Sequence, residues 1–473
     1  MGSQLKIALP KGRLLAQTAE LLEKAGWGLA DYHEKTRSYR LKSQRFPGLM
    51  IKVFQEKDIP IQVAVGNYDL GICGLDWVEE LLAKYPSSAV IRVADLGYGD
   101  GALYVAGGPD AVADTGELKA REDIIRIASE YPNLAELYAQ RLRLKHFAIY
   151  PLWGAAEAYP PESADLVLLS GTGEELISRG LVPVDKMVKF RALLIANKNS
   201  LKSKDMAEIL ASTTCRLPSS VIHSKQVDVT ELPVIAKPMM AKRVNQDVVR
   251  LALPDGHQQA HVGHILEQAG IQVEGYPSAN GNRRPASSLD GVTIKVIRPQ
   301  DMPLQVASGN FDLAITGRDW LTEHKHQFPS SPVKELLDLK YGRVRVVAVV
   351  SQDVPVESID GLRRLYSQSE VPCRVTSEYI NIADHYVRSN RFSRYRVIPT
   401  WGASEAFLPE DADFLIENTE TGGTIARHNL KIIDTLFEST ACLIGSTSTA
   451  SSLVKSRRME YIVGLFKKAA GSM

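Results

Sequence analysis

Short apolar runs alternate with longer amphipathic stretches along the whole chain. Strand-like runs occur at 5–9, 49–54 and 69–73, and apolar residues recur at helical spacing over 14–25 and 76–82. A further set of strand-like runs follows at 126–127, 147–150 and 166–169. This alternation predicts an α/β fold with mixed, mainly parallel sheets.

The whole pattern occurs twice. IALPKG from Ile7 recurs as LALPDG from Leu251, GNYDLGICGLDW from Gly66 recurs as GNFDLAITGRDW from Gly309, and WGAAEA from Trp153 recurs as WGASEA from Trp401. The copies stay 243 to 249 residues apart, which indicates duplication of a whole unit and not a short structural repeat.

The duplication predicts the domain boundaries. We expect a first unit over 1–225, a linker over 226–247 and a second unit over 248–473. Each unit is large enough for two lobes with a cleft between them. The lobes are expected at about 1–95 plus 192–225 and 96–191 in the first unit, and at about 248–338 plus 440–473 and 339–439 in the second. If the ancestral unit formed a two-fold dimer, the chain is a covalent pseudo-dimer.

Composition excludes several classes of protein. The chain is 44% hydrophobic and 23% charged, and its 56 basic against 55 acidic residues give a net charge of +1. Neither nucleic acid nor a membrane surface is therefore expected as a partner, and any anion must be bound by local groups. The four cysteines form no C-x-x-C pair, and the N-terminus lacks the layout of a secretory signal, which favours a cytoplasmic location.

The sharpest candidate for chemistry is the turn Thr421-Gly-Gly-Thr424, which follows an apolar run at 414–416. Glycines at a strand-to-helix junction let backbone N–H groups converge on a phosphate, and the two threonine hydroxyls add donors. Glu417 and Glu420 precede the turn and are suited to hold vicinal sugar hydroxyls or a metal carried by a diphosphate. The competing interpretation is an ordinary capped turn, but both acids at this spacing favour the phosphate site.

Many motifs, in order, resemble those of the ATP phosphoribosyltransferase family, whose members are the first enzyme of histidine biosynthesis. They are Leu5 to Leu14, Asp58 to Pro60, Asp69 to Gly74, Ala128 to Leu134, Trp401 to Ala406, Glu417 to Thr424, Asn429 to Asp434 and Glu438 to Thr440. The resemblance implies a two-lobed fold like that of type II periplasmic binding proteins, with the active site in the interlobe cleft. It also implies phosphoribosyl pyrophosphate (PRPP) and ATP as substrates, Mg²⁺ carried by the diphosphate and not held by the protein alone, and a possible separate regulatory subunit or further oligomer.

The two halves differ in complementary ways. Lys11-Gly12-Arg13 in the first half corresponds to Asp255-Gly256-His257 in the second, so a cation has become an anion. Conversely, the first half's turn, Ser170 to Glu175, lacks both acids and ends in Glu175, whose carboxylate would repel a phosphate. Arg298, Arg343 and Arg345 have no basic counterpart in the first half. Each arginine alone is typical of a solvated surface, but together with the turn they favour a site.

We therefore expect one competent site per chain, in the second unit. The PRPP-binding residues would be Glu417, Glu420, Thr421, Gly422, Gly423 and Thr424, and the catalytic residues Glu417, Glu420, Arg298 and Arg343. Nucleotide and diphosphate phosphates would meet Lys11, Arg13, Arg298, Arg343 and Arg345. Lys11 and Arg13 would either reach across from the first unit or serve a vestigial anion site there.

Three questions stay open in the sequence. Asp255 and His257 stand where cations are expected, so a PRPP-dependent transferase with another acceptor is an alternative to ATP phosphoribosyl transfer. A non-catalytic ligand-binding or regulatory paralogue is the second alternative. His257, His261 and His264 lie at helical spacing, but no carboxylate completes a metal site, and a solvated helix face explains them better.

Overall fold

The computed structural model describes residues 4–29, 31–34, 38–109, 115–214, 247–277, 281–446 and 452–471. The chain divides into two compact units. Unit 1 comprises Met1–Tyr150, Ala164–Met239 and Trp401–Ala406, and unit 2 comprises Pro151–Ser163, Met240–Thr400 and Phe407–Met473. Each unit thus includes a short segment from the other half of the sequence. The predicted linker 226–247 lies outside the described residues except for Asp247, and the domain boundaries inferred from the repeat stay a prediction.

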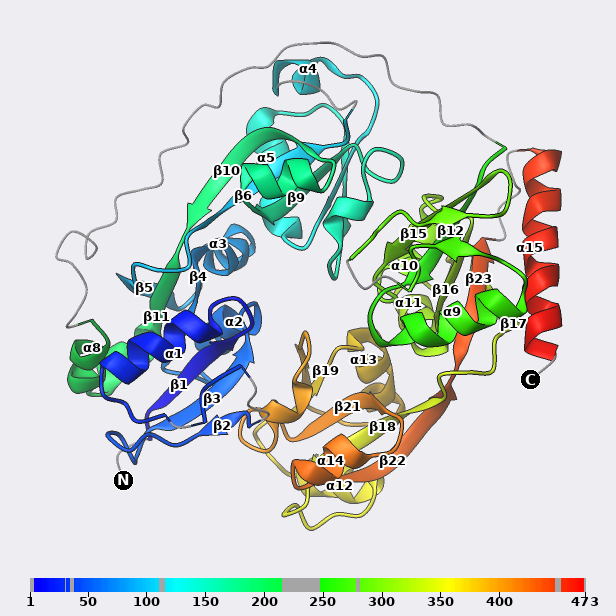
Figure 1. Cartoon of the computed structure of the whole chain (residues 1–473). Coiled ribbons are helices and arrows are strands. Elements are labelled where there is room, and N and C mark those ends of the chain that lie inside the picture. The colour runs from blue at the N-terminus through cyan, green and yellow to red at the C-terminus, as the bar shows by residue number, and fades with distance from the viewer. Residues whose placement is uncertain are drawn as a thin grey trace. The chain divides into compact units, whose positions relative to one another are not determined.

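The first sheet of unit 1 has the strand order β2-β3-β1-β4-β11-β5. The strands are β1 (Lys6–Lys11), β2 (Arg40–Leu41), β3 (Met50–Gln55), β4 (Leu70–Gly74), β5 (Val90–Asp95) and β11 (Ala192–Asn197). The helices are α1 (Leu15–Lys24), α2 (Asp58–Ala64), α3 (Leu75–Lys84), α7 (Lys198–Ser203) and α8 (Ala207–Thr214). Strand β4 is buried along its whole length, as expected for a strand covered on both faces, and Figure 1 shows α1 lying along one face of this sheet.

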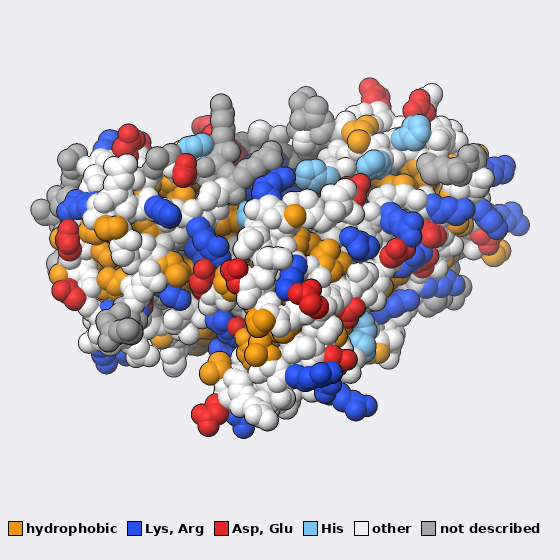
Figure 2. Space-filling view, turned by 90° about the horizontal axis from the view of Figure 1, so that it is seen from below, with side chains coloured by type: hydrophobic (Ala, Val, Ile, Leu, Met, Phe, Trp, Pro, Cys, Tyr) orange, Lys and Arg blue, Asp and Glu red, His pale blue; other side chains and the backbone are white. Residues whose placement is uncertain are grey.

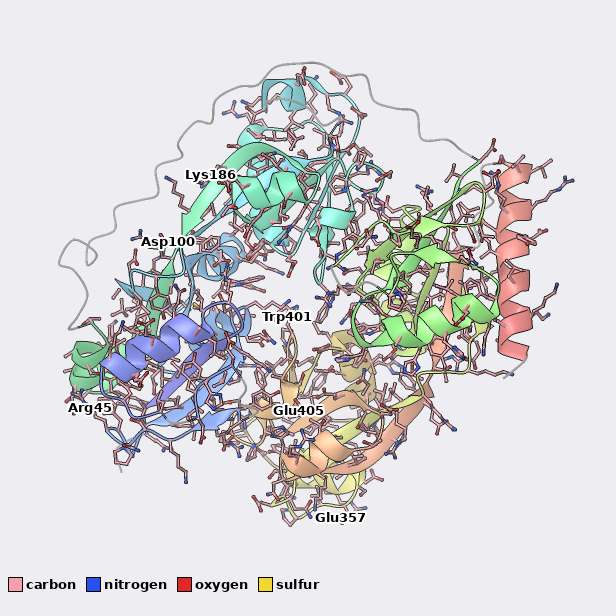
Figure 3. All side chains as sticks on the ribbon, in the orientation of Figure 1. Arg45, Asp100, Lys186, Glu357, Trp401 and Glu405 are labelled. Carbon is pink, nitrogen blue, oxygen red and sulfur yellow. The ribbon has the colours of Figure 1, made fainter. Side chains whose placement is uncertain are left out.

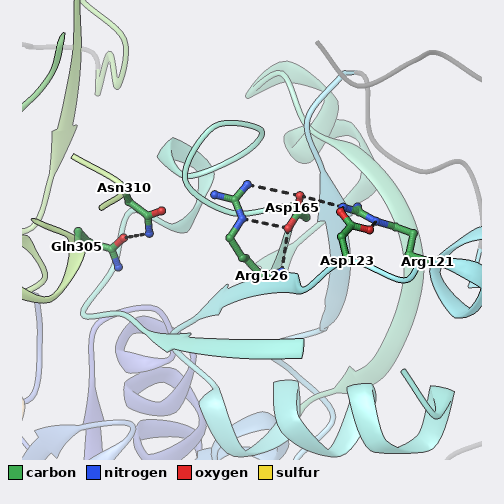
Figure 4. A network of polar contacts seen from close by, with 6 residues as sticks. All are labelled: Arg121, Asp123, Arg126, Asp165, Gln305 and Asn310. Carbon is green, nitrogen blue, oxygen red and sulfur yellow. Dashed lines mark hydrogen bonds and ion pairs between the residues drawn. The ribbon is translucent and has the colours of Figure 1, made fainter. Parts of the chain in front are cut away.

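The second sheet of unit 1 has the order β10-β6-β9-β7-β8. Its strands are β6 (Gly101–Gly107), β7 (Ile125–Ser129), β8 (Phe147–Pro151), β9 (Leu166–Gly171) and β10 (Val182–Phe190), with helices α4 (Thr115–Ala120), α5 (Pro132–Leu142) and α6 (Gly173–Ser178). Asp165, just before β9, accepts hydrogen bonds from the Arg126 backbone N–H at 2.8 Å and from its Nε at 3.1 Å. Arg121 extends this network, drawn in Figure 4, which fixes the start of β9 beside β7.

Unit 2 repeats both sheets. The first has the order β15-β12-β16-β23-β17 and the second β20-β19-β21-β18-β22. The strands of the first sheet are β12 (Val249–Pro254), β15 (Val292–Ile297), β16 (Leu313–Gly317), β17 (Val333–Asp338) and β23 (Ala441–Ser446). Those of the second are β18 (Val344–Ser351), β19 (Cys373–Ser377), β20 (Tyr395–Pro399), β21 (Phe414–Thr419) and β22 (Leu430–Ser439).

The helices of unit 2 follow the same plan. They are α9 (Gln259–Gln268), α10 (Met302–Ala307), α11 (Arg318–Gln327), α12 (Ile359–Ser367), α13 (Ile380–Ser389), α14 (Gly423–Arg427) and α15 (Leu453–Gly471), with 3₁₀ turns at Ala156–Ala158 and Gly256–Gln258. A third 3₁₀ turn, Ser404–Phe407, lies at the boundary between the units. A small hairpin, β13 (Val273–Glu274) with β14 (Ala286–Ser287), is added, and Figure 1 shows α15 beside α9 and β17. Among the described helices, none is long and apolar enough to cross a membrane.

Equivalent strands pair in equivalent register. Ile7 of β1 pairs with Ile51 of β3, and Leu251 of β12 pairs with Ile294 of β15. The duplication read from the sequence is therefore a duplication of structure, and the predicted fold class, a tandem pair of two-sheet α/β units, is confirmed. The expectation that the sheets are mainly parallel is wrong. Each sheet of unit 2 has two parallel and two antiparallel pairings, because the strand that returns from the other lobe, such as β23, enters antiparallel.

Each sheet has its own hydrophobic core. One cluster in unit 1 joins residues of β1, β3, β4 and β11 with α1, including Ile7 and Leu194, and another gathers around β6, β7 and β9. Unit 2 has the corresponding pair of clusters. Separate cores are what two lobes require, since each lobe then buries its own apolar side chains. Outside the cores, basic and acidic side chains are interspersed on the face drawn in Figure 2, in keeping with the net charge of +1.

A buried lysine occupies the same position in both repeats. Lys52 of β3 donates a hydrogen bond to the Ala406 carbonyl at 2.7 Å. Lys295 of β15 lies 2.7 Å from Glu162 Oε2 and also donates to the Tyr159 carbonyl. Burial lowers the pKa of Lys295 to about 8 in spite of this carboxylate. Both lysines fasten a short segment from the other half of the sequence onto their own unit.

The depressed pKa of Lys295 predicts a stability change with pH. An ammonium whose folded pKa lies below its unfolded value destabilises the fold at lower pH, and the penalty disappears between the folded and unfolded pKa values. We expect the wild type to gain about 1–3 kcal/mol relative to Lys295→Met between pH 8 and 10.5. Urea unfolding at several pH values measures the difference. The matched control Lys334→Met removes an exposed lysine and should leave the pH profile unchanged.

Candidate functional site

The predicted phosphate turn lies between β21 and α14. Gly422 adopts the left-handed conformation (φ 79°) that glycine tolerates, and its N–H donates to Thr419 Oγ1 at 2.9 Å. The Gly423 N–H donates to Thr421 Oγ1 at 3.4 Å. The backbone N–H groups of Thr424 and Ile425 meet no acceptor among the described residues. Two helix N-terminal donors thus remain open to an anion.

The two acids differ in their surroundings. Glu417 is half-buried on β21, where it pairs in register with Val347, and Glu420 is exposed in the turn itself. Asn418 lies between them, and its Nδ2 donates to the Tyr379 hydroxyl oxygen at 2.6 Å and to Asp319 Oδ2 of α11 at 3.4 Å. Strand β21 therefore delivers one sheltered and one solvated carboxylate to the same edge of the sheet as the open turn.

The corresponding turn of unit 1 is closed by its own carboxylate. Thr172 caps α6, its Oγ1 accepts the Glu175 N–H at 3.2 Å, and Glu175 Oε2 accepts the Thr172 N–H at 2.8 Å. This capping box uses the Glu175 N–H, and the Leu176 N–H donates to the Thr172 carbonyl at 3.1 Å, so both counterparts of the open donors of unit 2 are taken. The carboxylate at 175 therefore occupies the N-terminus of α6, which is a more specific obstacle than the simple repulsion inferred from the sequence.

A buried aspartate at the start of α11 ties the turn to the first lobe of unit 2. Asp319 Oδ2 accepts the Tyr379 hydroxyl at 2.6 Å, and Asn418 Nδ2 donates to the Tyr379 oxygen at 2.6 Å. Burial raises the pKa of Tyr379 well above its usual value, and the Asp319 charge adds to this, so the phenol stays a donor. The position of β21 next to the turn thus depends on a hydrogen-bond chain from the other lobe.

Unit 1 carries the same chain with an arginine added. Asp76 Oδ2 accepts the Tyr131 hydroxyl at 2.8 Å and also pairs with Arg13 Nη2 at 2.7 Å. Arg13 further pairs with Glu56 and lies over the Phe190 ring at 4.5 Å. Lys11, by contrast, lies with its ammonium 5.2 Å from the centre of the Tyr39 ring. Of the two cations predicted to grip nucleotide phosphates, Arg13 is therefore already committed to two carboxylates.

The predicted arginines of unit 2 lie on three elements. Arg298 follows β15 and lies 3.6 Å from Asp255 Oδ2. Arg343 precedes β18 and pairs with Glu438 on the surface. Arg345, on β18, is half-buried, pairs in register with Thr419 of β21, and has no ion-pair partner within the described chain. The strand pairing brings Arg345 next to the start of the turn.

Sequence reasoning missed Arg283, which alters the meaning of Asp255. Arg283 Nη1 lies 2.6 Å from Asp255 Oδ2, and its Nε lies 2.9 Å from Glu157 Oε1. All three side chains are less than a fifth exposed. Burial alone would raise the pKa of Asp255, but the hydrogen bond and charge of Arg283 lower it overall. The anion that replaces Lys11 in this repeat is thus neutralised within unit 2. Nothing in the local sequence signals this, because Arg283 comes from a loop 28 residues away.

Arg318 is the second residue that the sequence reasoning missed. It is the first residue of α11, and it pairs with Glu335 at 2.7 Å and Asp338 at 3.1 Å. Its hydrogen bond to Glu335 is the largest of several contacts that raise its pKa, so it stays charged. Thr440 donates to the same Asp338 at 2.8 Å. Comparison of the repeats could have found Arg318, since the first half has the apolar Leu75 at this position.

No group of three or more His, Cys, Asp or Glu side chains in the described part of the chain is placed to hold a metal. Glu417 and Glu420 offer oxygen ligands of the kind Mg²⁺ prefers, but too few to hold it alone. The donor set therefore fits a metal that arrives on a diphosphate.

The fold and this site define a class of protein. A two-sheet α/β unit with an open glycine-threonine turn, two preceding acids and surrounding arginines is typical of an enzyme that binds a phosphorylated sugar. The family model for ATP phosphoribosyltransferase (HisG) matches residues 55–216 and 298–467, one segment in each repeat. The chain belongs to the ATP phosphoribosyltransferase family.

Individual relatives match one repeat's length at a time. An ATP phosphoribosyltransferase of Geotalea uraniireducens is 31% identical over 229 residues, which is 47% of this chain and 73% of that protein. One of Chlorobaculum parvum is 28% identical over 230 residues, 48% of this chain and 72% of that protein. Among solved structures, the ATP phosphoribosyl transferase (HisG:HisZ) complex from Thermotoga maritima is 19% identical over 48% of this chain and all of that chain, with a TM-score of 0.39.

The hydrogen bonds of Asp319 with Tyr379 and of Asp76 with Tyr131 predict unequal losses of stability when the tyrosine hydroxyls are removed. Tyr379→Phe removes the strongest contact of Asp319 and should cost about 1–3 kcal/mol of unfolding free energy. Tyr131→Phe should cost less, because Arg13 still satisfies Asp76 with two hydrogen bonds. Urea denaturation of both variants measures the two losses. Equal losses, or a greater loss for Tyr131→Phe, would contradict this account of the chain.

Proposed function

We propose that unit 2 transfers the phosphoribosyl group of PRPP to N1 of the adenine of ATP and releases pyrophosphate, the first step of histidine biosynthesis. Membership of the family supports the reaction. The observation that carries the assignment to unit 2 is the open turn before α14, in contrast to the self-capped turn before α6. The predicted one site per chain follows from this difference.

In this proposal the turn binds the 5′-phosphate of PRPP. The N–H groups of Thr424 and Ile425 and the exposed hydroxyls of Thr421 and Thr424 supply the donors. Hydrogen bonds that oriented N–H groups donate to an ionised oxygen are short and strong, so they fix the sugar's position. Positioning is the main catalytic requirement here, because adenine N1 has its own lone pair and needs no general base.

Glu417 and Glu420 are proposed to hold the ribose hydroxyls. As pyrophosphate leaves, positive charge develops on the ribose ring, and a nearby carboxylate stabilises it. The half-buried Glu417 is better placed for this role than Glu420, since shelter from water strengthens electrostatic interactions. Glu420, solvated in the turn, is suited to bind a hydroxyl.

The leaving diphosphate is proposed to meet Arg298, Arg343 and Arg345. Mg²⁺ brought with it would neutralise part of its charge. Arg343 and Glu438 form an exposed pair, 70% and 52% accessible, and such pairs are worth little, so Arg343 is released to a diphosphate at low cost. Arg345 needs no release.

The loop that contains Asp255 bears on the choice of acceptor. Asp255 replaces the cation of the first repeat, and this observation favours a second candidate function, phosphoribosyl transfer to an acceptor other than ATP. The pairing of Asp255 with Arg283 and Arg298 supports ATP as the acceptor, because the loop then presents cations beside the aspartate. Incubation with PRPP, Mg²⁺ and separate nucleobases and nucleotides, followed by product analysis, separates the two. Product from ATP alone supports the first candidate.

Three further features are proposed from the family and composition. The chain would act as an internal pseudo-dimer. It would bind a separate regulatory subunit, as the short members of the family do. It would be located in the cytoplasm. Donation of Lys11 or Arg13 in trans stays a prediction. Within unit 1, Arg13 is paired with Glu56 and Asp76.

Exchanging the closing residue of each turn tests the assignment of the site. Thr424→Glu copies the first repeat and should lower turnover by at least about a thousandfold, because a carboxylate then competes for the phosphate donors. The matched variant Glu175→Thr should leave turnover within about twofold. A pyrophosphate-release assay measures both. A large loss with Glu175→Thr would refute the assignment to unit 2, and no pyrophosphate release from wild type despite PRPP binding would favour the non-catalytic alternative.

A further inference from the structure

Unit 1 contains a pocket of about 530 Å³ where its two sheets meet. Its charged lining comprises four basic residues, Arg92, Lys186, Lys189 and Arg191, and two acidic residues, Asp95 and Asp100. The pocket also includes Gly171 and Thr172 from the closed turn, so it lies at the position that corresponds to the proposed active site of unit 2. Figure 3 labels Lys186 on β10 and Asp100 just before β6.

The strand registers identify the counterparts of these residues in unit 2. Lys189 pairs with Ala102 and Glu438 pairs with Arg345, so Lys189 stands where unit 2 has Glu438. In the same way Lys186 corresponds to Thr435, and Arg92 corresponds to Glu335. Arg191 corresponds to Thr440. Every basic residue of the pocket thus replaces an acid or a threonine of the other repeat.

The reverse substitutions complete the change. Leu75 replaces Arg318, Ala102 replaces Arg345, and Asp100 replaces Arg343. Unit 2 combines arginines with acids, which suits a diphosphate that carries Mg²⁺. The pocket of unit 1 lacks counterparts of Glu335, Glu438 and the acids of the turn, and its own acids are only Asp95 and Asp100. An excess of cations in a partly apolar pocket is suited to an anion without a metal.

The basic residues differ in how far they are already engaged. Arg92 pairs with Glu79, and Arg191 lies 2.5 Å from Asp100. The Lys186 ammonium lies 5.3 Å from the centre of the Tyr104 ring, an interaction that leaves its hydrogen-bond donors available. Lys189 is exposed and has no charged partner among the described residues. These two lysines of β10 are the donors that a ligand would meet.

We propose that the unit 1 pocket binds a small anion with two or more negative charges in the absence of a metal, through Lys186 and Lys189. The ligand would carry phosphate or carboxylate groups, and it would contact both lobes, because Arg92 lies on β5 of the first sheet and the lysines lie on β10 of the second. The pocket is therefore a second ligand site of the chain, different in charge from the site proposed for catalysis.

Isothermal titration of the full chain in EDTA tests this proposal, with inorganic pyrophosphate and succinate as separate probes. We expect one binding event per chain for at least one probe. The double variant Lys186→Thr/Lys189→Glu, which copies unit 2, should weaken binding at least tenfold. Thr424→Glu should leave it unchanged, which separates this site from the proposed catalytic turn. The probe that binds identifies the ligand as a phosphate or a carboxylate.

Three outcomes would overturn the proposal. They are no binding of either probe, unchanged binding in the double lysine variant, and loss of binding in Thr424→Glu. Circular dichroism and the urea midpoint of the double variant show whether it is folded, and Lys186→Arg/Lys189→Arg, which keeps both charges, should retain binding within about threefold. Because turnover depends on the other unit, catalytic failure of the wild type would leave these results interpretable.

Discussion

The functional difference between the units depends on the backbone N–H groups at the N-terminus of one short helix, α14 in unit 2 and α6 in unit 1. A helix start leaves several N–H groups without partners, and they must be satisfied by a side chain, water or a ligand. In α14 the N–H groups of Thr424 and Ile425 have no acceptor in the part of the chain that the structure describes. In α6 the corresponding N–H groups are closed, because that of Glu175 donates to Thr172 Oγ1 and that of Leu176 donates to the Thr172 carbonyl. One backbone plan thus gives a turn that accepts a phosphate and a turn that already contains its anion.

Charge has been redistributed over a backbone that stayed the same. Strand registers agree between the repeats, yet Asp255 stands where the first repeat has Lys11 at the end of β1, and β10 has lysines where β22 has Thr435 and Glu438. The exchanges are compensated locally: Asp255 is paired with Arg283, and Arg13 is paired with Asp76. Pairing of this kind lets a duplicated unit change its ligand without losing its fold, because the sheltered carboxylates of Asp255 and Asp76 each keep a cationic partner.

The repeat, the strands and the strand-to-helix position of the turn could be predicted from the sequence, because they depend on local periodicity and on short motifs. The run 414–416 became β21, and the glycines at 422 and 423 begin α14 as expected. What failed depends on contacts distant in sequence. The returning strand β23 made the sheets less parallel than predicted, and the bond from Arg283 to Asp255 joins two loops. The commitment of Arg13 could not be foreseen, since Glu56 and Asp76 come from separate elements.

The central claim is that a single turn per chain, the one before α14, binds the phosphate of the sugar donor. A crystal structure of the full chain with PRPP and Mg²⁺ tests this most directly. The account predicts density for the 5′-phosphate against the N–H groups of Thr424 and Ile425, with the ribose beside Glu417 and Glu420, and none against α6. Density for the 5′-phosphate at Thr172 and Glu175, in place of the α14 turn or in addition to it, would contradict the account.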